Sequence, residues 1–239
     1  MQGLQGTDVN AFGRSQKVTV IFMLLSVLFV VCLIVSNLIE IKVVDLGWFT
    51  ITAGFVVFPI SYIINDCIAE VWGFRKARLI IWSGFAMNFF VVMLGLIAVA
   101  LPAAPFWDGA PHFNFVFGMA PRIVAASLTA FLVGSFLNAY VMSRMKVASG
   151  GRHFSARAIW STVVGETADS LIFFPVAFGG IIAWQELLLM MCTQIVLKSM
   201  YEVIILPVTI RVVKAIKRID GSDVYDEGIS YKVWKISEI

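Results

Sequence analysis

The sequence predicts an all-α membrane protein: a polytopic bundle of six transmembrane helices with the N and C termini on the cytoplasmic side. Hydrophobic residues make up 60% of the 239 residues and charged residues only 14%, whereas soluble domains are about half apolar and a quarter charged. The apolar residues are grouped into long runs separated by short polar connections. Lysine and arginine are concentrated in alternate connections, which assigns the two sides of the membrane.

Each apolar run is long enough to cross a hydrocarbon core of about 30 Å at about 1.5 Å per helical residue. The first run lacks a small-residue cleavage site and is expected to be retained. Proline lies inside the second, fifth and sixth runs and is expected to kink or interrupt those helices, at Pro59, Pro175 and Pro207. The expected spans are residues 18–39, 48–72, 79–101, 121–142, 158–184 and 187–210.

The basic residues orient this bundle. They are concentrated in the N-terminal tail, in the second and fourth connections and in the C-terminal tail, while the opposite side has Lys42 and, at the edge of a span, Arg122. The positive-inside rule then places both termini in the cytoplasm. We expect a cytoplasmic N-tail over residues 1–16, a six-helix transmembrane domain over 17–213 and a cytoplasmic C-tail over 214–239.

Two smaller features carry expectations of their own. In the C-tail, a helix extension and then a strand-like segment over residues 231–236 are expected. The cysteines Cys32, Cys67 and Cys192 lie in apolar runs without CxxC spacing. We interpret them as free buried thiols, neither a disulfide framework nor a zinc site.

The most informative polar groups are Glu166 and Asp169 in the fifth span. They lie about 14 and 18 Å from its cytoplasmic end, and their i, i+3 spacing puts both on one helix face. A charge at such a depth costs roughly 2.5–3.5 kcal/mol on insertion scales. This face is therefore expected to contact protein, water or a ligand.

Other polar residues extend the candidate site. Asp66 and Glu70 follow Tyr62 at i+4 and i+8 on the second span, with Asn65 beside them, although Glu70 is near enough to the cytoplasmic end to mark the interface only. The sixth span carries Gln194, Lys198 and Glu202 at the same spacing. The candidate substrate-binding residues are Asn65, Asp66, Glu70, Arg122, Glu166, Asp169, Gln194, Lys198 and Glu202.

Two alternatives remain open among these residues. Lys198 either pairs with Glu202 along its own helix, which neutralises both, or reaches across to Glu166 or Asp169 and leaves an acceptor-rich pocket. Arg122, near the outer edge of the fourth span, either extends to the lipid headgroups or closes the pocket from above.

The sequence argues against several kinds of chemistry. His112 and His153 fall in connections, and no HExxH motif or Walker loop occurs. The residues around Asp66 and Asp169 do not resemble an aspartyl intramembrane protease. We therefore expect no enzyme, no catalytic residues, no metal and no cofactor. Carboxylates, amides, a lysine and aromatic residues suit a small, flat heterocycle with several N–H donors, and cation or proton coupling is the competing use of the acids.

Three segments together resemble the queuosine precursor transporters of the vitamin uptake transporter family. They are FPISYIINDCIAEVWG at residues 58–73, RIVAAS at 122–127 and STVVGETADSLIFFPVAF at 161–178. The resemblance covers roughly residues 19–213. It implies a bacterial inner-membrane importer of 7-cyano- and 7-aminomethyl-7-deazaguanine. It also implies a fold similar to the substrate-binding subunits of energy-coupling-factor transporters, and it favours Asp66, Arg122 and Asp169 as site residues.

The alternative function is a substrate-capture subunit for another vitamin or heterocycle that needs a separate ATPase module. A more distant alternative is a membrane enzyme or scaffold that binds no ligand at the buried acids. The expected partners are a small deazapurine and the lipid bilayer, with no nucleic acid. A homo-oligomer and an energy-coupling module are left open.

Overall fold

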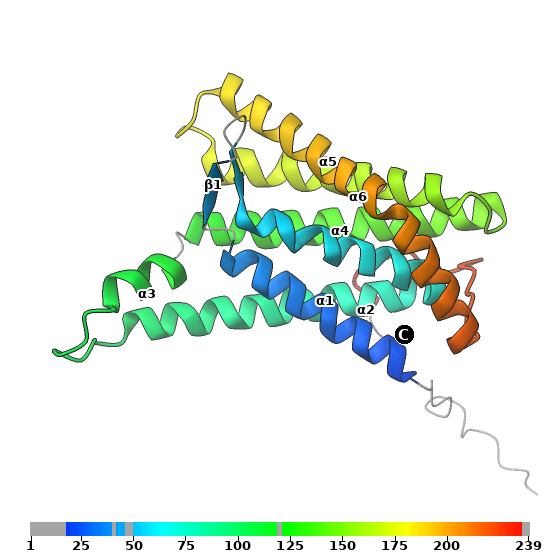
Figure 1. Cartoon of the computed structure of the whole chain (residues 1–239), viewed down its shortest axis with the longest axis horizontal. Helices are drawn as coiled ribbons and strands as arrows, with labels where there is room; N and C mark the ends of the chain where they lie inside the picture. Colours follow the sequence, from blue (N-terminus) through cyan, green and yellow to red (C-terminus); the bar gives the residue numbers. More distant parts are fainter. Residues whose placement is uncertain (1–17, 40–41, 46–49, 119–120, 236–239) are drawn as a thin grey trace, which may run out of the picture.

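The protein is built from long helices. The computed structural model describes residues 18–39, 42–45, 50–118 and 121–235, so the expected N-terminal tail lies outside the described residues. Figure 1 shows the long helices side by side, with α3 at one end of the bundle and the C-terminal residues at the other. The elements are α1 (Val20–Ile39), β1 (Val43–Asp45), β2 (Thr50–Thr52), η1 (Ala53–Val56), α2 (Phe58–Ala100), α3 (Ala110–Phe117), α4 (Pro121–Ser149), α5 (Phe154–Phe178) and α6 (Trp184–Asp220).

Helix α2 consists of two arms that reverse direction at Gly73. This residue has φ 81° and ψ 176°, a non-helical conformation that glycine adopts without a Cβ clash. Trp72 packs edge-on against Phe22 of α1 at 5.2 Å, and the Lys76 ammonium lies 5.6 Å from the same ring. The chain therefore turns back beside the start of α1, where the sequence predicts the connection between the second and third spans.

Several of these helices can cross a membrane. Among the described residues, three stretches are long and apolar enough: Val20–Ile39, Ala53–Ala100 and Ala110–Ser149. The second stretch includes both arms of α2. Helices α5 and α6, of 25 and 37 residues, are also long enough, but charged side chains such as Glu166, Asp169 and Lys198 lie within them. The structure is thus that of a helical, multi-pass membrane protein.

The start of the second predicted span differs from the expectation of a helix from residue 48. Strands β1 and β2 pair antiparallel with Val43 opposite Thr52, and the single 3₁₀ turn of η1 follows. Helix α2 begins only at Phe58, with Pro59 in its first turn. Proline is well tolerated at this position because its missing N–H has no intrahelical partner there, so Pro59 starts the helix rather than kinking it.

The other prolines also do not interrupt their helices. Pro175 and Pro207 both lie within continuous helices, Pro175 in the last turn of α5. In a membrane bundle, neighbouring groups compensate for the hydrogen bond that proline removes. A further difference is that the connection between the expected spans 79–101 and 121–142 contains the short helix α3.

Two predictions about exposure and the C-tail are wrong. Cys32 and Cys67 are buried, but Cys192 is exposed because it lies on the outward face of α6. Residues 231–235 form no strand, because their backbone groups bond to side chains of α2 instead of to a neighbouring strand. Residue 236 lies outside the described part of the chain. Helix α6 itself continues to Asp220, past the expected tail boundary at residue 214.

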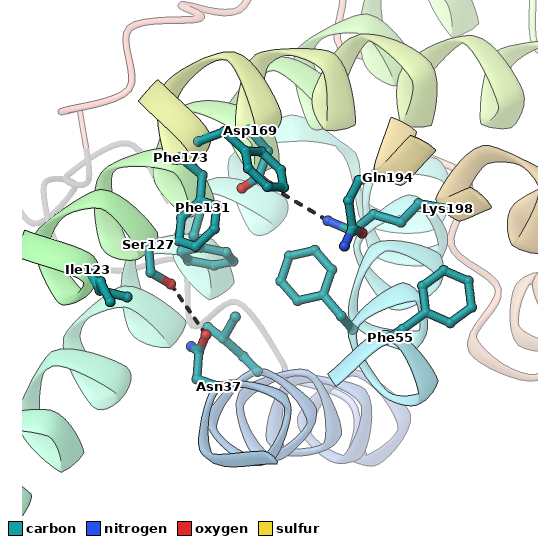
Figure 2. A pocket seen from close by; sticks show the side chains of 12 residues that line it. Asn37, Phe55, Ile123, Ser127, Phe131, Asp169, Phe173, Gln194 and Lys198 are labelled. Carbon is teal, nitrogen blue, oxygen red and sulfur yellow. Dashed lines mark hydrogen bonds and ion pairs between the residues drawn. The ribbon is translucent and has the colours of Figure 1, made fainter. Parts of the chain in front are cut away.

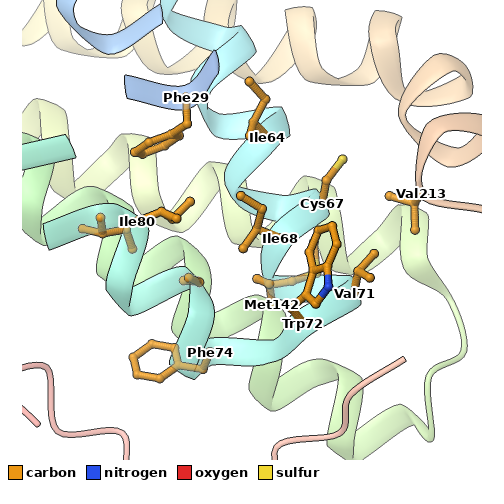
Figure 3. Packing of buried hydrophobic residues seen from close by; sticks show 14 of the residues in the cluster. Phe29, Ile64, Cys67, Ile68, Val71, Trp72, Phe74, Ile80, Met142 and Val213 are labelled. Carbon is orange, nitrogen blue, oxygen red and sulfur yellow. The ribbon is translucent and has the colours of Figure 1, made fainter. Parts of the chain in front are cut away.

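The largest apolar core surrounds the reversal in α2. Figure 3 shows Trp72 and Phe74 on either side of this turn, with Ile68, Ile80 and Met142 packed nearby. Large apolar side chains also cover the outside of the bundle, including Leu24, Phe90, Leu189 and Ile204. An apolar exterior of this kind is expected of helices that face lipid.

Glycines bring α4 and α5 close together. A Cβ on Gly134 of α4 would lie 2.9 Å from the Gly165 carbonyl oxygen and 2.8 Å from the Tyr62 hydroxyl oxygen. A Cβ on Gly165 of α5 would lie 2.9 Å from the Gly134 carbonyl oxygen. The two backbones therefore pack as closely as small residues allow, a common device in membrane bundles. This contact positions the part of α5 that carries Glu166 and Asp169.

Candidate functional site: a polar cavity inside the bundle

A cavity opens between the helices at the end of the bundle that contains η1. The empty space inside it, counted together with its open mouth, is about 750 Å³. Figure 2 shows the side chains converging on it from opposite sides. The lining residues are Leu33 and Asn37 of α1, Phe55 of η1, Phe58 of α2, Ile123, Ser127 and Phe131 of α4, Asp169, Phe173 and Phe174 of α5, and Gln194 and Lys198 of α6.

The charged wall of this cavity is formed by three side chains from two helices. The Lys198 ammonium nitrogen lies 2.8 Å from a Glu166 carboxylate oxygen and 3.7 Å from an Asp169 carboxylate oxygen. Of the two arrangements expected for Lys198, the structure shows the one that reaches across to α5. One lysine faces two carboxylates, so this wall has an excess of hydrogen-bond acceptors. Asp169 and Lys198 line the cavity, and Glu166 is buried behind them.

Aromatic side chains give the cavity flat apolar surfaces. The Lys198 ammonium lies 4.2 Å from the centre of the Phe58 ring, which adds a cation–π contact to its two ion pairs. Phe173 and Phe174 pack edge to face at 5.3 Å. Phe55 and Phe131 also line the cavity. A planar ligand can stack on such rings while its polar edge meets the charged wall.

A second polar wall faces the cavity from the other side. The Ser127 hydroxyl donates a hydrogen bond to the Asn37 side-chain oxygen at 3.3 Å, which joins α4 to α1 (Figure 2). This wall is neutral, so the cavity has one charged side and one uncharged side. Neither Asn37 nor Ser127 is among the site residues predicted from the sequence.

Asn65 and Asp66 lie deeper in the bundle and do not line the cavity. The Asn65 amide donates to the Asn138 side-chain oxygen at 2.8 Å and to the Ser135 carbonyl at 3.3 Å. Asp66 is completely buried and accepts a hydrogen bond from Ser161 at 3.3 Å. These groups tie α2 to α4 and α5 beneath the cavity.

Glu202 is also buried away from the cavity. It is 1% exposed, and neither it nor Asp66 forms an ion pair with a described residue. One oxygen of each carboxylate also has no hydrogen-bond partner among the described residues. The bundle thus contains two buried carboxyl groups that have no basic partner among the described residues.

Glu70 is the centre of a charge cluster at the opposite end of this α2 arm. Its two carboxylate oxygens accept from both terminal nitrogens of the Arg157 guanidinium, and Lys217 lies 2.7 Å away. The Lys146 ammonium is 3.9 Å from Glu70 and also donates to the Glu70 carbonyl. Arg157, Lys146 and Lys217 are not among the predicted site residues, because nothing in their local sequence pattern indicates a common partner.

Arg122 lies outside the cavity and neither closes it nor extends away from the protein. Its guanidinium donates to the Val176 carbonyl at 2.5 Å and to the Gly179 carbonyl at 2.7 Å. These carbonyls belong to the end of α5, where the last oxygens of a helix lack intrahelical donors. Arg122 therefore caps α5 and fixes it to the start of α4.

The predicted site residues thus fall into three groups. Asp169, Gln194 and Lys198 line the cavity, with Glu166 directly behind. Asn65, Asp66 and Glu202 are buried elsewhere in the bundle, and Glu70 and Arg122 belong to contacts at its ends. The described residues contain no group of three or more acidic, histidine or cysteine side chains suited to a metal. The carboxylates of this cavity can accept hydrogen bonds from N–H groups, its lysine can donate to a carbonyl, and its aromatic side chains can stack on a flat ring.

Long apolar helices around an internal polar cavity define a membrane transport protein. Residues 52–212 match the family described as "Putative vitamin uptake transporter". The chain belongs to this family of multi-pass bacterial membrane proteins, and the resemblance seen in its motifs is confirmed. No solved structure gives a significant match.

Three curated relatives show the same affiliation. The chain is 32% identical to the "Probable queuosine precursor transporter" of Bacillus subtilis strain 168. The match extends over 154 residues, which are 61% of this chain and 64% of that relative. Over 174 residues, 71% and 74% of the two chains, it is 29% identical to the "Queuosine precursor transporter" of Escherichia coli K12. The chain is also 29% identical to the "Probable queuosine precursor transporter" of Haemophilus influenzae, over 53% of this chain and 52% of that relative. The match thus spans just under two thirds of the Bacillus protein.

Proposed function

We propose that this protein imports queuosine precursors across the bacterial inner membrane, specifically 7-cyano- and 7-aminomethyl-7-deazaguanine, and binds the base in the cavity. The names of three relatives support the precursor class. The observation that carries the proposal is the charged wall, where Lys198 faces Asp169 and Glu166.

The chemistry of a guanine-like edge matches this wall. The base presents a ring N–H and an exocyclic amino group side by side, next to a carbonyl oxygen. A carboxylate accepts both N–H groups, and such charge-assisted bonds are stronger than neutral ones. In our proposal Asp169 accepts these donors, Lys198 donates to the carbonyl oxygen, and Gln194 adds a further amide contact. Glu166 holds Lys198 in place.

The bicyclic ring accounts for the aromatic lining. Phe58, Phe173 and Phe174 surround the polar groups, so the ring can lie flat against an apolar face while its edge reaches Asp169. Asn37 and Ser127 then face the opposite edge of the ligand. Asn65, Asp66 and Glu202 support the site from below and do not touch the base.

The orientation of the protein in the membrane follows from the basic residues. We propose six spans, formed by α1, the two arms of α2, α4, α5 and α6, with both termini cytoplasmic. Arg75, Arg152 and Arg218 then lie on the cytoplasmic side, as the positive-inside rule requires. In this orientation the cavity lies toward the outer surface, and the Glu70 cluster lies at the cytoplasmic end.

A binding measurement tests the substrate. The purified protein is heated with each deazaguanine, with guanine and with a panel of vitamins. A ligand specific for the folded state stabilises it by RT ln(1 + [L]/Kd), so the two deazaguanines are expected to raise the melting temperature in a concentration-dependent way. Stabilisation by a vitamin but not by the deazaguanines would overturn the substrate assignment.

A transport measurement separates the proposal from a capture subunit. Liposomes that contain only this protein are expected to accumulate labelled deazaguanine without ATP. Binding without accumulation would instead favour a subunit that depends on a separate ATPase module. The absence of both binding and uptake would leave a membrane enzyme or scaffold as the remaining function.

A further inference from the structure

The chain does not end with α6 but crosses the end of the bundle opposite the cavity. Helix α6 stops at Gly221, which adopts the left-handed conformation with φ 71° and donates its N–H to the Lys217 carbonyl. Residues 221–235, called here the C-terminal strap, then pack against α2 and α4. No substrate role or family motif accounts for this segment.

Asp226 anchors the strap at the reversal of α2. Its carboxylate accepts the Phe74 backbone N–H at 2.7 Å and the Ser143 hydroxyl of α4 at 2.5 Å. A Cβ on Gly73 would lie 2.6 Å from the same carboxylate, so the glycine at the turn also makes room for the strap. Next to it, the Val224 N–H donates to the Val71 carbonyl at 3.0 Å. The Asp226 side chain thus links the turn between the two arms of α2 to α4.

The second half of the strap is held by the next turns of α2. The guanidinium of Arg78, a fully buried residue, donates to the Lys232 carbonyl at 2.7 Å. The Trp82 indole N–H donates to the Val233 carbonyl at 2.8 Å. Tyr231 packs on Phe74, with ring centres 5.1 Å apart. Side chains of α2 thus provide hydrogen-bond donors to strap carbonyls that would pair with a neighbouring strand in a β-sheet.

Asp223 links the strap to the Glu70 cluster. It lies 2.5 Å from the Lys146 ammonium of α4 and 2.8 Å from the Lys217 ammonium of α6. Burial opposes the ionisation of Asp223, but the hydrogen bonds from the two lysines outweigh it and hold the pKa of this carboxyl below its usual range. Through Glu70 the same cluster includes Arg157 at the start of α5. The strap therefore connects the ends of α2, α4, α5 and α6.

These contacts are of a kind that can open and close again. Asp226 is the one buried side chain of the strap, Tyr225 and Trp234 are 40% and 71% exposed, and Ile229, Tyr231 and Val233 are partly buried against the core. The strap is held mainly by hydrogen bonds and charge pairs, and Asp223, which forms two of these pairs, is 44% exposed and can exchange its partners for water.

We propose that the C-terminal strap is a cytoplasmic latch: while Asp226 and Asp223 are docked, the helix ends cannot separate, and the strap must undock for the cavity to open inward. This inference rests on the proposed function and its orientation, since an importer has to release its substrate at this end. The strap then sets the balance between states that are closed and open to the cytoplasm.

The first test measures access to the bundle interior and needs no substrate. Cys67 of α2 is buried and serves as the reporter after Cys32→Ala and Cys192→Ala. In inside-out vesicles, an impermeant thiol reagent should label Cys67 about tenfold faster with Asp226→Ala, since two hydrogen bonds to a charged group are lost. Glu227→Ala removes an exposed neighbouring carboxylate and should leave the rate unchanged. Equal rates in the two variants would overturn the latch.

The second test closes the latch and so does not depend on a weakened fold. The variant combines Ser143→Cys and Asp226→Cys, and all three native cysteines are replaced by alanine. The native side-chain oxygens at these two positions are 2.5 Å apart, so the two thiols can form a disulfide on oxidation. The oxidised protein should bind deazaguanine but accumulate it at least about tenfold more slowly than the reduced protein, because the inward-open state is lost. Uptake at the same rate in both forms would overturn the latch. If the proposed function is wrong, the wild-type protein will neither bind nor accumulate deazaguanine. The rate of Cys67 labelling would still test whether the strap acts as a latch.

Discussion

Lys198 of α6 and Glu166 of α5 place their charged atoms 2.8 Å apart inside the bundle, where Glu166 is 1% exposed. Neither group could lie there alone, because a buried charge is tolerated only when it is paired. The pair also directs the Lys198 ammonium toward Asp169, which lines the cavity. One contact between two helices therefore supports the fold and shapes the proposed binding site.

Replacing Lys198 tests both consequences. Lys198→Met keeps the length of the side chain but leaves Glu166 and Asp169 without their cation, so the free energy of unfolding should fall by roughly 3 kcal/mol. Deazaguanine affinity should fall as well. Lys214→Met, at an exposed position of the same helix, is the matched control. A thermal melt of both variants checks this, and equal melting temperatures would contradict the importance of the ion pair.

Asp169→Asn isolates the proposed contact with the base. The amide keeps the volume but replaces one acceptor oxygen with a donor that faces the N–H groups of the ligand. Losing a charge-assisted hydrogen bond of roughly 1.5–3 kcal/mol should raise Kd about 10- to 100-fold and abolish uptake. Titration calorimetry measures the change. Asp108→Asn makes the same substitution at an exposed loop position and should have no effect. Normal uptake by the Asp169 variant would contradict the site assignment.

Glu70→Gln distinguishes a structural acid from a binding one. This change leaves Arg157, Lys146 and Lys217 short of the carboxylate that they share, so stability should fall by roughly 3 kcal/mol. Deazaguanine affinity measured on the folded protein should hardly change, because Glu70 does not line the cavity. Glu227→Gln is the matched control. A large loss of affinity at unchanged stability would mean that Glu70 contacts the ligand after all.

Gly134→Ala tests the close contact of α4 and α5. The added Cβ would lie 2.9 Å from the Gly165 carbonyl oxygen, and that backbone cannot move without shifting α5. Overpacking of this kind costs roughly 1–3 kcal/mol. Because α5 carries Asp169, affinity should decrease together with the melting temperature. Ala125→Val enlarges an exposed position of α4 and should change neither.

Much of this architecture is predictable from local patterns. The apolar runs predict where the helices lie, and the charged residues 75–78 predict a connection close to the actual reversal at Gly73. Glu166 and Asp169 indicate a protein-facing stripe because hydrocarbon excludes them. The helix ends are less predictable: α4 extends to Ser149 and α6 to Asp220, since polar residues outside the apolar layer are equally compatible with helix.

The contacts between distant segments are not predictable in this way. Lys198 had two acceptable partners at the level of sequence, and the packing of α6 on α5 selects between them. Glu70 and Lys217 are 147 positions apart, so no periodicity connects them. The docking of Asp226 depends on a backbone N–H that is exposed only because Gly73 breaks the helix. Such contacts follow from the assembled fold rather than from any local segment.

The charge pairs of the strap predict how its docking depends on pH. The hydrogen bonds from Lys146 and Lys217 lower the pKa of Asp223 against the effect of burial. For Lys217, burial opposes the charged form, but bonds to Asp223 and Glu70 outweigh it and raise the pKa of the ammonium. The contribution of Asp223 is complete above its unfolded pKa, about 3.9, and is lost as pH falls through the lower folded value. That of Lys217 is complete below its unfolded pKa, about 10.4, and is lost as pH rises through the higher folded value.

For Lys146, burial lowers the pKa of the ammonium despite its bond to Asp223, so its contribution has the opposite sign to that of Lys217 and only the acid limit of docking is defined. The strap should therefore stay docked at neutral pH and loosen as the pH falls below about 4. A nitroxide attached to exposed position 227, by Glu227→Cys in protein without native cysteines, reports its mobility by electron paramagnetic resonance. In Asp223→Asn the strap should be more mobile at neutral pH, and the part of the acid transition due to Asp223 should disappear. Release of the strap near pH 7 in the wild-type chain, or an unchanged acid transition in the variant, would show that Asp223 does not hold the strap in place.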